Sequence, residues 1–383
     1  MNDLIIKNGN VYIDGGFKKA NLIIQEGLIK EITPEDKNLD GFEVFDANGQ
    51  NIVPGFIDVH THGAINVDVN AATAEDFHKL SHFFATQGTT SWLCSILTDT
   101  KEQTLWCIDQ YNKQKYCDSD GAKLMGIHLE GPFLAPEYKG AMPEHLLIKP
   151  DMKLIEEYQK AAEGDVKYIT VSPEIEGVPD YIKDLKDMGI VVAIGHSGAD
   201  YDTAMKCIEN GVTSATHTFN AMRLMHQHFP AIAGAVLESD IYCEAICDGR
   251  HLHPGVVRLL IKTKGIDKVV AVTDSIMATG LPDGNYKLGV NDVVVIDGDA
   301  KLANGGSRAG STLTTMNALK NLIEFTKRPL EEIIVLLTKN PATLLGIYDK
   351  IGSIEVGKYA DLVVLNKDND VIDTFVQGKK INK

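Results

Sequence analysis

Eight short apolar runs, rich in β-branched residues, recur through the middle of this 383-residue chain, with helical stretches between them. Strands that alternate with helices in this way are typical of parallel βα units. Eight such units in succession predict an α/β fold, a (β/α)8 barrel of the TIM type, whose active site lies where the strands end. The runs are residues 52–59, 89–97, 123–129, 166–171, 190–194, 213–216, 242–246 and 269–273.

Capping signals mark several of the helices between these runs. A helix over 74–85 is expected to begin after Thr73, and one over 201–209 to begin after Asp200. A longer last helix over 312–326 follows a glycine-rich insertion. These signals agree with the alternation of strands and helices.

The two ends of the chain have a different pattern, with short strands and turns and no long helix. Asn8-Gly9 is one of several turn signals near the N-terminus, and the tail repeats this pattern between residues 352 and 376. We therefore expect both ends to form one small discontinuous β-sandwich. It would consist of residues 1–52 and 349–383, beside a barrel of residues 53–348.

Composition excludes several classes of protein. The net charge of -16 disfavours nucleic-acid binding, because a polyanion requires clustered Lys and Arg.

The first residues lack the features of a secretory signal, and no apolar run approaches the roughly 20 residues that cross a bilayer. Six cysteines in a chain of this length fit a reducing compartment rather than a disulfide framework. We expect a cytoplasmic protein without a membrane partner. The cysteines are Cys94, Cys107, Cys117, Cys207, Cys243 and Cys247.

The first of the eight runs ends in two histidines one residue apart, His60 and His62. Side chains alternate between the two faces of a strand, so both imidazoles point the same way and can reach one metal ion. Neutral imidazole is a common ligand of catalytic divalent metals. Many such pairs are surface or packing residues, so the interpretation depends on the other strand ends.

Ionisable residues also stand at the ends of other runs. Glu130 follows the third run, His196 the fifth, His217 the sixth, His251 the seventh and Asp274 the eighth. The carboxyl ends of barrel strands meet at one mouth, so we expect these groups to converge there. Independent packing residues have no reason to select that rim. We therefore interpret the set as metal ligands and acid/base groups.

Other histidines have simpler interpretations. His128 shares a strand face with Glu130, and it is either a hydrogen-bond partner of a ligand or a residue that fills the barrel. His78 and His82 have helical spacing between the first two strands, which favours a solvated or packing role.

Several motifs resemble a known family. PGFIDVHTHG and the closing GKYADLVVL resemble the amidohydrolase superfamily. HLEGPF, IGHS, THTFNAM, DGRH and VTDS follow in the order found in one of its branches, the N-acetylglucosamine-6-phosphate deacetylases. The resemblance covers essentially the whole chain. It implies the barrel with a β-sandwich, a homodimer, and metal-dependent hydrolysis of N-acetylglucosamine 6-phosphate to glucosamine 6-phosphate and acetate in amino-sugar catabolism.

The resemblance also implies roles for the residues at the strand ends. Asp274 would be the catalytic acid/base, and Glu130 would bridge two metals. Some members of the branch have lost the first histidine pair and use a single metal, so one or two divalent metals per subunit are implied. The ligand types suit zinc, iron, manganese and cobalt, of which zinc or iron is expected. The implied ligands are Glu130, His196, His217, His60 and His62.

Nine substrate contacts follow from the same resemblance: Ala141, Met142, Asn220, Ala221, His228, His251, Arg308, Ala309 and Gly310. Three positions depart from the pattern of the branch. His228 stands where relatives have an Arg for the sugar phosphate, Met142 stands where they have His or Gln, and Arg308 replaces the apolar residue usual before Ala-Gly-Ser. A neutral imidazole donates one hydrogen bond where Arg supplies a charged fork. Arg223, His226 or Arg308 could replace that contact.

These departures keep the choice of substrate open. The alternatives to an N-acetylglucosamine-6-phosphate deacetylase are a deacetylase for the galactosamine epimer, N-acetylgalactosamine 6-phosphate, and another amidohydrolase for a different N-acyl amine or cyclic amide. A noncatalytic binding scaffold would normally have lost metal ligands, and none of the five is missing here. The expected partner is therefore a small amino-sugar phosphate.

Overall fold

The eight predicted runs form a closed parallel barrel. The structure is a computed structural model that describes residues 3–34, 36, 40–115 and 120–382, so Cys117 lies outside the described residues. Neighbouring strands in the barrel follow one another in sequence, which confirms the predicted βα succession. The barrel strands are β6 (Phe56–Thr61), β9 (Thr89–Leu97), β10 (Lys123–Glu130), β11 (Val166–Val171), β12 (Val191–Ile194), β13 (Ser214–Ala215), β14 (Tyr242–Ile246) and β15 (Val269–Val272).

The barrel closes between its first and last strands, just beyond the end of β15. The backbone N–H of Asp274 donates to the carbonyl of His60 at 2.8 Å, and that of His62 donates to the carbonyl of Ser275 at 2.7 Å. Thr61 and Ser275 also pair through their hydroxyl groups at 2.7 Å. The seam of the barrel therefore includes three residues that the sequence places at the active site, His60, His62 and Asp274.

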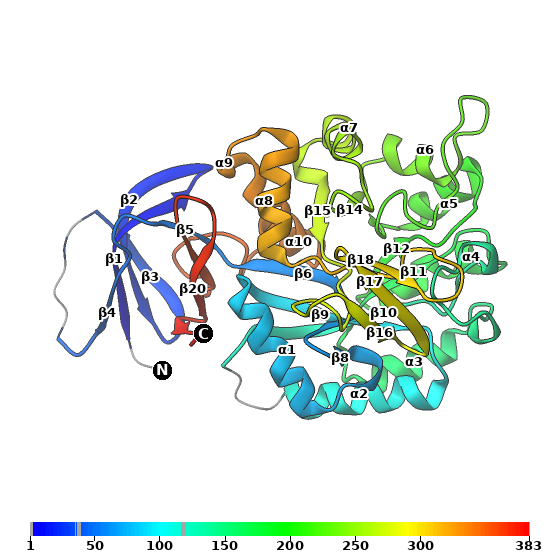
Figure 1. The fold of residues 1–383 in the computed structure, drawn as a ribbon, viewed down its shortest axis with the longest axis horizontal. Coiled ribbons are helices and arrows are strands. Elements are labelled where there is room, and N and C mark those ends of the chain that lie inside the picture. The colour runs from blue at the N-terminus through cyan, green and yellow to red at the C-terminus, as the bar shows by residue number, and fades with distance from the viewer. Residues whose placement is uncertain (1–2, 35, 37–39, 116–119, 383) are drawn as a thin grey trace.

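Helices cover the outside of the barrel, as Figure 1 shows. Thr73 caps the first of them in a capping box with Asp76, and Asp200 caps α5, as predicted. The last long helix begins at Thr315 rather than Thr312, because the Thr314 side chain caps its first turn. The helices are α1 (Ala74–Thr86), α2 (Lys101–Lys115), α3 (Met152–Ala161), α4 (Val178–Asp187), α5 (Tyr201–Asn210), α6 (Ala231–Glu238), α7 (Pro254–Lys264), α8 (Thr315–Thr326), α9 (Leu330–Ile333) and α10 (Lys339–Leu344). Across the described ranges, no helix combines the length and apolar character needed to cross a bilayer.

The two ends of the chain meet in one sheet beside the barrel (Figure 1). Val53 of β5 pairs with Val363 of β19 in antiparallel register, which joins the N-terminal strands to the C-terminal ones. The sheet has an apolar core of its own, separate from that of the barrel. This arrangement agrees with the predicted terminal β-sandwich, whereas the boundaries at residues 52 and 349 stay a prediction. The strands are β1 (Leu4–Ile13), β2 (Gly16–Gln25), β3 (Leu28–Thr33), β4 (Glu43–Asp46), β5 (Asn51–Pro54), β19 (Leu362–Leu365), β20 (Val371–Val376) and β21 (Lys379–Lys380).

The first predicted run divides between the two domains. Residues 51–54 belong to the terminal sheet as β5, and residues 56–61 belong to the barrel as β6. Gly55 lies between them, and a Cβ at this position would approach Thr90 Oγ1 to 2.1 Å. The chain therefore changes domain at a residue that has no side chain, which lets the backbone pass close to β9.

The glycine-rich insertion before α8 contains a small antiparallel sheet that the sequence reading did not include. Its strands are β16 (Gly284–Leu288), β17 (Asn291–Ile296) and β18 (Asp299–Leu302). Val293 and Val295 belong to an apolar cluster that also contains Leu97, Met142 and Ile276. The small sheet thus packs on loops at the mouth of the barrel.

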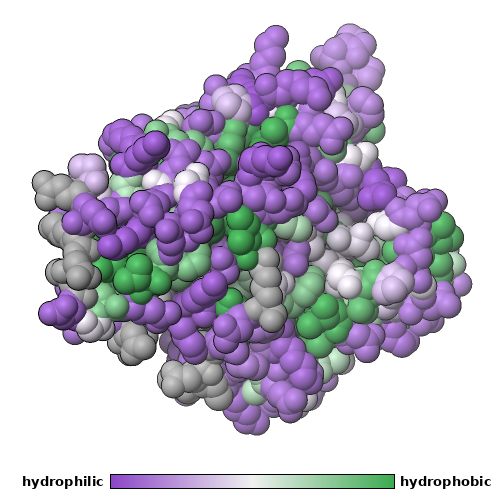
Figure 2. Space-filling view, turned by 60° about the vertical axis from the view of Figure 1, so that its left-hand side comes forward, coloured by the Kyte–Doolittle hydropathy of each residue, from purple (hydrophilic) through white to green (hydrophobic). Residues whose placement is uncertain are grey.

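The molecular surface is mostly hydrophilic on the face shown in Figure 2, where apolar residues form separate patches. The cysteines that the structure describes are all free and buried. These thiols therefore act as small apolar core residues.

Candidate active site

Six ionisable side chains converge at the mouth of the barrel, and all six are buried. Each comes from the carboxyl end of a strand, where the sequence placed it. The structure thus brings the predicted metal ligands and the predicted acid/base residue together, while their roles stay a prediction. They are His60 on β6, His62 just after it, Glu130 on β10, His196 after β12, His217 after β13 and Asp274 after β15.

Glu130 lies in the middle of this group. Its Oε1 lies 3.1 Å from Nε2 of His196 and 3.3 Å from Nε2 of His217. Its Oε2 lies 3.2 Å from Nε2 of His62. Oε1 also lies 3.5 Å from Nε2 of His60, so one carboxylate lies between two histidine pairs, as a bridging ligand would.

Asp274 lies beside the first histidine pair. Its Oδ1 is 3.3 Å from Nε2 of His62 and 3.6 Å from Nε2 of His60. The ligand atoms form two sets, and within each set all atoms lie within 4.8 Å of one another. The sets are His60, His62 and Asp274, and Glu130, His196 and His217.

Backbone carbonyls fix the ring orientation of two histidines. Nδ1 of His62 lies 2.9 Å from the carbonyl oxygen of Ser95, and Nδ1 of His196 lies 2.8 Å from that of Tyr138. A carbonyl only accepts hydrogen bonds, so Nδ1 keeps its proton, and Nε2 is the ring nitrogen left to hold a cation at the centre of the site. Nε2 of His196 also lies 3.0 Å from Nε2 of His217. Two ring nitrogens this close fit a cation as their common partner.

The electrostatics of the site agree with that fit. Burial alone would raise the pKa of the Glu130 carboxyl, but the surrounding imidazoles, His60 foremost, hold it well below its usual range. Burial would also raise the pKa of Asp274, yet His60 and His62 lower it. The two carboxylates in turn raise the pKa of His62 to about 9, against the effect of burial. The carboxylates are therefore ionised at neutral pH and attract positive charge, and the set of ligands suits a divalent metal.

Three of these residues have left-handed backbone conformations. The φ angles are 48° at His196, 28° at His217 and 49° at Asp274. Residues other than glycine rarely adopt this backbone conformation. Such strain concentrates at functional sites, where the surrounding structure holds it in place. The sharp turn after each strand directs the side chain back over the barrel mouth.

A cavity of about 340 Å³ opens above the six residues. Eight of the nine predicted substrate contacts line it, and they are Ala141, Met142, Asn220, Ala221, His251, Arg308, Ala309 and Gly310. His228 is not among the lining residues, because it lies exposed on the loop before α6. Arg223 and His226 are exposed on the same loop, so neither reaches this cavity within one subunit.

Polar groups at the rim of this cavity are already engaged. Arg308 forms a two-point contact with Asp299, with Nε 3.0 Å from Oδ1 and Nη2 3.3 Å from Oδ2. Nδ1 of His251 lies 2.7 Å from Asp248. Met142 is buried and contributes to an apolar wall. The cavity therefore has an apolar side and two oriented cationic or imidazole groups at its rim.

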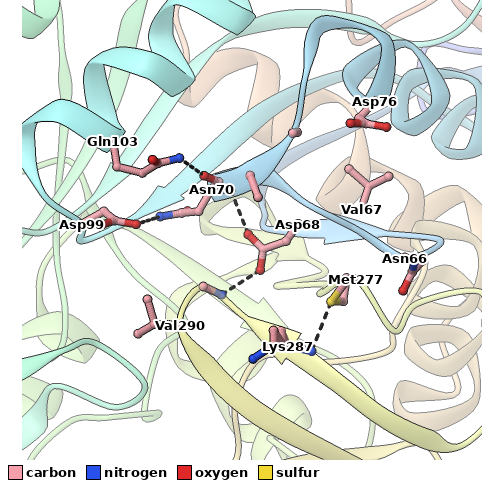
Figure 3. Close-up of a pocket in the computed structure, with 13 residues that line it drawn as sticks. Asn66, Val67, Asp68, Asn70, Asp76, Asp99, Gln103, Met277, Lys287 and Val290 are labelled. Atoms are coloured by element: carbon pink, nitrogen blue, oxygen red, sulfur yellow. Dashed lines mark hydrogen bonds between the residues drawn. The ribbon is translucent and has the colours of Figure 1, made fainter.

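A second cavity, of about 430 Å³, lies on the other side of the turn between β16 and β17 (Figure 3). Leu288 lines the first cavity, whereas Lys287, Gly289 and Val290 line the second. Asp68 in the second cavity accepts hydrogen bonds from the N–H groups of Asn70 and Gly289. The second cavity contains no histidine among its lining residues. Although it is larger, it lacks the converging ligands, so the first cavity is the candidate active site.

Sequence reasoning did not identify Glu244 on β14 as a site residue. It is fully buried, and its Oε2 lies 2.9 Å from Nδ1 of His60. The available signal was an acidic residue inside an apolar strand, since a buried carboxylate requires partners.

For His128 the sequence left two roles open, a hydrogen-bond partner of a ligand or a residue that fills the barrel. Its two ring nitrogens pair with the hydroxyl groups of Ser95 and Thr170. His128 therefore fills the barrel beneath the site.

Comparison with known proteins gives consistent relatives. The family model of the amidohydrolase family matches residues 51–381. The N-acetylglucosamine-6-phosphate deacetylase of Bacillus subtilis (strain 168) is 33% identical over 381 residues, which cover 98% of this chain and 95% of that protein. The crystal structure of N-acetylglucosamine-6-phosphate deacetylase from Pasteurella multocida superposes with a TM-score of 0.93 at 30% identity, covering 100% of both chains. A variant of the Mycobacterium smegmatis enzyme, solved in complex with N-acetyl-D-glucosamine-6-phosphate, gives a TM-score of 0.92 at 29% identity, again over 100% of both chains. The chain therefore belongs to the amidohydrolase family.

Proposed function

We propose that this protein hydrolyses the acetamide of N-acetylglucosamine 6-phosphate to glucosamine 6-phosphate and acetate, in amino-sugar catabolism. The observation that carries the proposal is the position of Glu130 between two histidine pairs at the mouth of the barrel. Two converging sets of ligands beside a carboxylate suit metal-assisted hydrolysis. The deacetylase names of the relatives support the choice of substrate.

Two divalent metals are the proposed cofactors, with zinc or iron favoured. His196, His217 and Glu130 would hold one ion, and His60 and His62 would hold the other with Glu130 between them. When bound, such ions polarise an amide carbonyl and lower the pKa of water from 15.7 toward about 7. The ring orientation of His62 and His196, fixed by backbone carbonyls, supports this assignment.

Asp274 is the proposed acid/base residue. Its lowered pKa keeps the carboxylate ionised, so it can accept a proton from the attacking water. The same carboxyl group can then pass that proton to the amine nitrogen, so that glucosamine 6-phosphate leaves as a neutral amine. The side chain lines the cavity, and a hydrogen bond from the backbone N–H of Asp274 to the carbonyl of His60 fixes the backbone that carries it.

Recognition of the phosphate is proposed to involve Arg308 and His251. Both line the cavity, and both are oriented by aspartates. The Arg308 guanidinium is partly neutralised by Asp299, which weakens its attraction for a phosphate relative to an unpaired arginine. A hexosamine phosphate stays the proposed substrate, and turnover of the galactosamine epimer is an outcome that the test below distinguishes.

We further propose a homodimer located in the cytoplasm. The loop before α6 projects from the barrel (Figure 1) and exposes three apolar side chains, those of Leu224, Met225 and Phe229, to 71%, 59% and 65%. Such side chains on a projecting loop suit contact with a second copy of the chain, and they lie beside His228. Free buried thiols suit a reducing compartment. Light scattering on wild-type protein and on the Leu224→Ser/Phe229→Ser double variant tests the assembly, since only the variant should be monomeric.

The function is tested by acetate release from four substrates on metal-replete protein. These are N-acetylglucosamine and N-acetylgalactosamine, each with and without a 6-phosphate. Turnover is expected for N-acetylglucosamine 6-phosphate, to be lost with a chelator and restored by zinc or iron. Preference for the galactosamine phosphate would change the substrate, and no turnover of any of the four would remove the proposal.

A further inference from the structure

We propose that Glu244 is a positioning residue that prepares both metal sets at once, by fixing the ring of His60 and the backbone of His217. The inference rests on the proposed function, and it concerns how the unloaded site is held ready for the ions. It is drawn from three contacts of one buried carboxylate.

The contacts of Glu244 reach both sets. Its Oε2 lies 2.9 Å from Nδ1 of His60 and accepts a hydrogen bond from the backbone N–H of His217 at 3.0 Å. Its Oε1 accepts a hydrogen bond from the hydroxyl group of Tyr168 at 2.5 Å. His60 belongs to one candidate ligand set and His217 to the other, so a single side chain on β14 contacts a member of each.

The partners explain why a carboxylate is tolerated at this position. Glu244 is fully buried, and an ionised carboxylate without partners would be very costly in the barrel interior. Its three partners are an imidazole, a backbone N–H and a phenol hydroxyl, and none is a lysine or an arginine. Hydrogen-bond donors converge on both oxygens, which is the arrangement that a carboxylate requires and an amide cannot fully reproduce.

The first contact determines which nitrogen of His60 faces the ions. A carboxylate oxygen accepts a hydrogen bond, so Nδ1 of His60 keeps its proton, and Nε2, on the side of Glu130 and Asp274, is the nitrogen that can give its lone pair to an ion. Backbone carbonyls perform this task for His62 and His196. His60 lies deeper in the barrel and uses a side chain instead, and the negative charge also makes its imidazole a better ligand.

The second contact holds a strained backbone. His217 has a φ of 28°, and its own Nδ1 has no hydrogen-bond partner in the structure. The ring of His217 is therefore oriented through its backbone rather than through Nδ1. The hydrogen bond from its N–H to Glu244 is one of the contacts that can hold this conformation.

Tyr168 holds the carboxylate in turn. Besides its hydrogen bond to Glu244, its ring packs edge-on against His128 with a centroid distance of 4.8 Å, and His128 packs against His60 at 4.6 Å. The rotation of Glu244 is restricted because both of its oxygens are engaged. Tyr168 thus supports His60 in two ways, through Glu244 and through His128.

The test compares Glu244→Gln with Glu238→Gln in metal-free protein. Glu238 is a matched control because its Oε2 also accepts a 2.5 Å hydrogen bond from a tyrosine, Tyr201, but on the surface at α6. Zinc alone is titrated against a competing chelator, and the bound ions per chain are counted. We expect Glu244→Gln to lose about 10-fold to 100-fold in zinc affinity at one or both sites, and Glu238→Gln to bind as wild type. Wild-type affinity at both sites in Glu244→Gln would overturn the proposal.

A second measurement needs no variant. Nitrogen NMR of ¹⁵N-histidine-labelled, metal-free wild-type protein reports which ring nitrogen of His60 carries the proton, with His60→Gln used to assign the signal. We expect the Nδ1–H form at alkaline pH, at which the ring has lost its second proton. The Nε2–H form would overturn the proposal even if Glu244→Gln fails to fold. Neither measurement uses a substrate, so the inference can hold if the proposed deacetylation fails.

Discussion

The backbone N–H of Asp274 donates to the carbonyl of His60 at 2.8 Å, while the Asp274 carboxylate lies 3.6 Å from Nε2 of the same histidine. One pair of residues therefore joins the last barrel strand to the first and also forms one side of the candidate site. The backbone of Asp274 thus completes the barrel, and its side chain completes the site.

Asp274→Asn separates these two roles. Asparagine keeps the backbone hydrogen bond and the shape of the side chain, so the fold should persist, but it cannot accept the proton from water. We expect kcat for acetate release to fall about 10²-fold to 10⁴-fold with little change in the melting temperature. Calorimetry and steady-state kinetics measure both. A variant with kcat within a few-fold of wild type would show that another group moves the proton.

Gly140→Ala should disturb the site through His196. Gly140 has a φ of 57°, and a Cβ there would lie 3.0 Å from Cε1 of His196, so the ring must shift. We expect kcat/KM to fall about tenfold, because a small displacement of a ligand is costly in catalysis. Gly164→Ala is the control, since Gly164 has a φ of 88° with nothing within 4 Å of its Cβ. Both variants should lose about 1 kcal/mol of unfolding free energy, but only the first should lose activity. Equal activity losses would contradict this prediction.

Arg308→Met tests the phosphate contact. Losing a charge-assisted hydrogen bond costs about 1.5 to 3 kcal/mol, so KM for the phosphorylated substrate should rise by about 10-fold to 100-fold while kcat changes less. Lys301→Met is the matched control, because Lys301 pairs with the same aspartate, Asp299, at 3.0 Å but does not line the cavity. If both variants have the same KM as wild type, the phosphate is held elsewhere.

Asp361 makes the stability of the protein depend on pH. Burial raises the pKa of its carboxyl from the ordinary 3.8 to about 7, so the folded state binds this proton more tightly than the unfolded state. Its stabilising effect is therefore complete at low pH and is lost as the pH rises from about 4 to about 7. Asp361→Asn keeps an oxygen that can accept from the N–H of Gln377, now at 2.7 Å. Asparagine should raise the unfolding free energy at pH 8 by at most about 4 kcal/mol and change it little at pH 4.

Thermal unfolding between pH 4 and pH 8 measures this effect. Asp240→Asn, at an exposed position, is the control and should show no comparable dependence on pH. A constant difference between Asp361→Asn and wild type across that range would contradict the titration of Asp361.

Local pattern was enough to predict the barrel and the residues at its mouth. Each strand is an apolar run bounded by turn signals, and strand-end histidines and carboxylates must meet once the barrel closes. The division of the first run at Gly55 was not predictable in the same way, because residues 52–59 read as one apolar stretch. The reason for the division is a close approach to Thr90, which is visible only in three dimensions.

Other features depend on contacts between distant residues. The resemblance placed His228 among the substrate contacts, but no local pattern shows that its loop projects away from the cavity of its own subunit. The strands of the glycine-rich insertion do have a local signal in the sequence. It is the β-branched run from Val293 to Ile296 before the Asp297-Gly298 turn, a pattern typical of a hairpin. The role of Glu244 depends on His60 and Tyr168, which are remote in sequence. Its position within an apolar strand is therefore the one local signal of that role.

The pairing of Val53 with Val363 has a consequence for synthesis. On the ribosome, β5 emerges long before β19 is translated, so the nascent chain carries an unpaired strand edge through most of its production. The terminal domain can reach its final form only after the tail leaves the exit tunnel. Premature termination before β19 would therefore release a polypeptide with an open edge that is prone to aggregation.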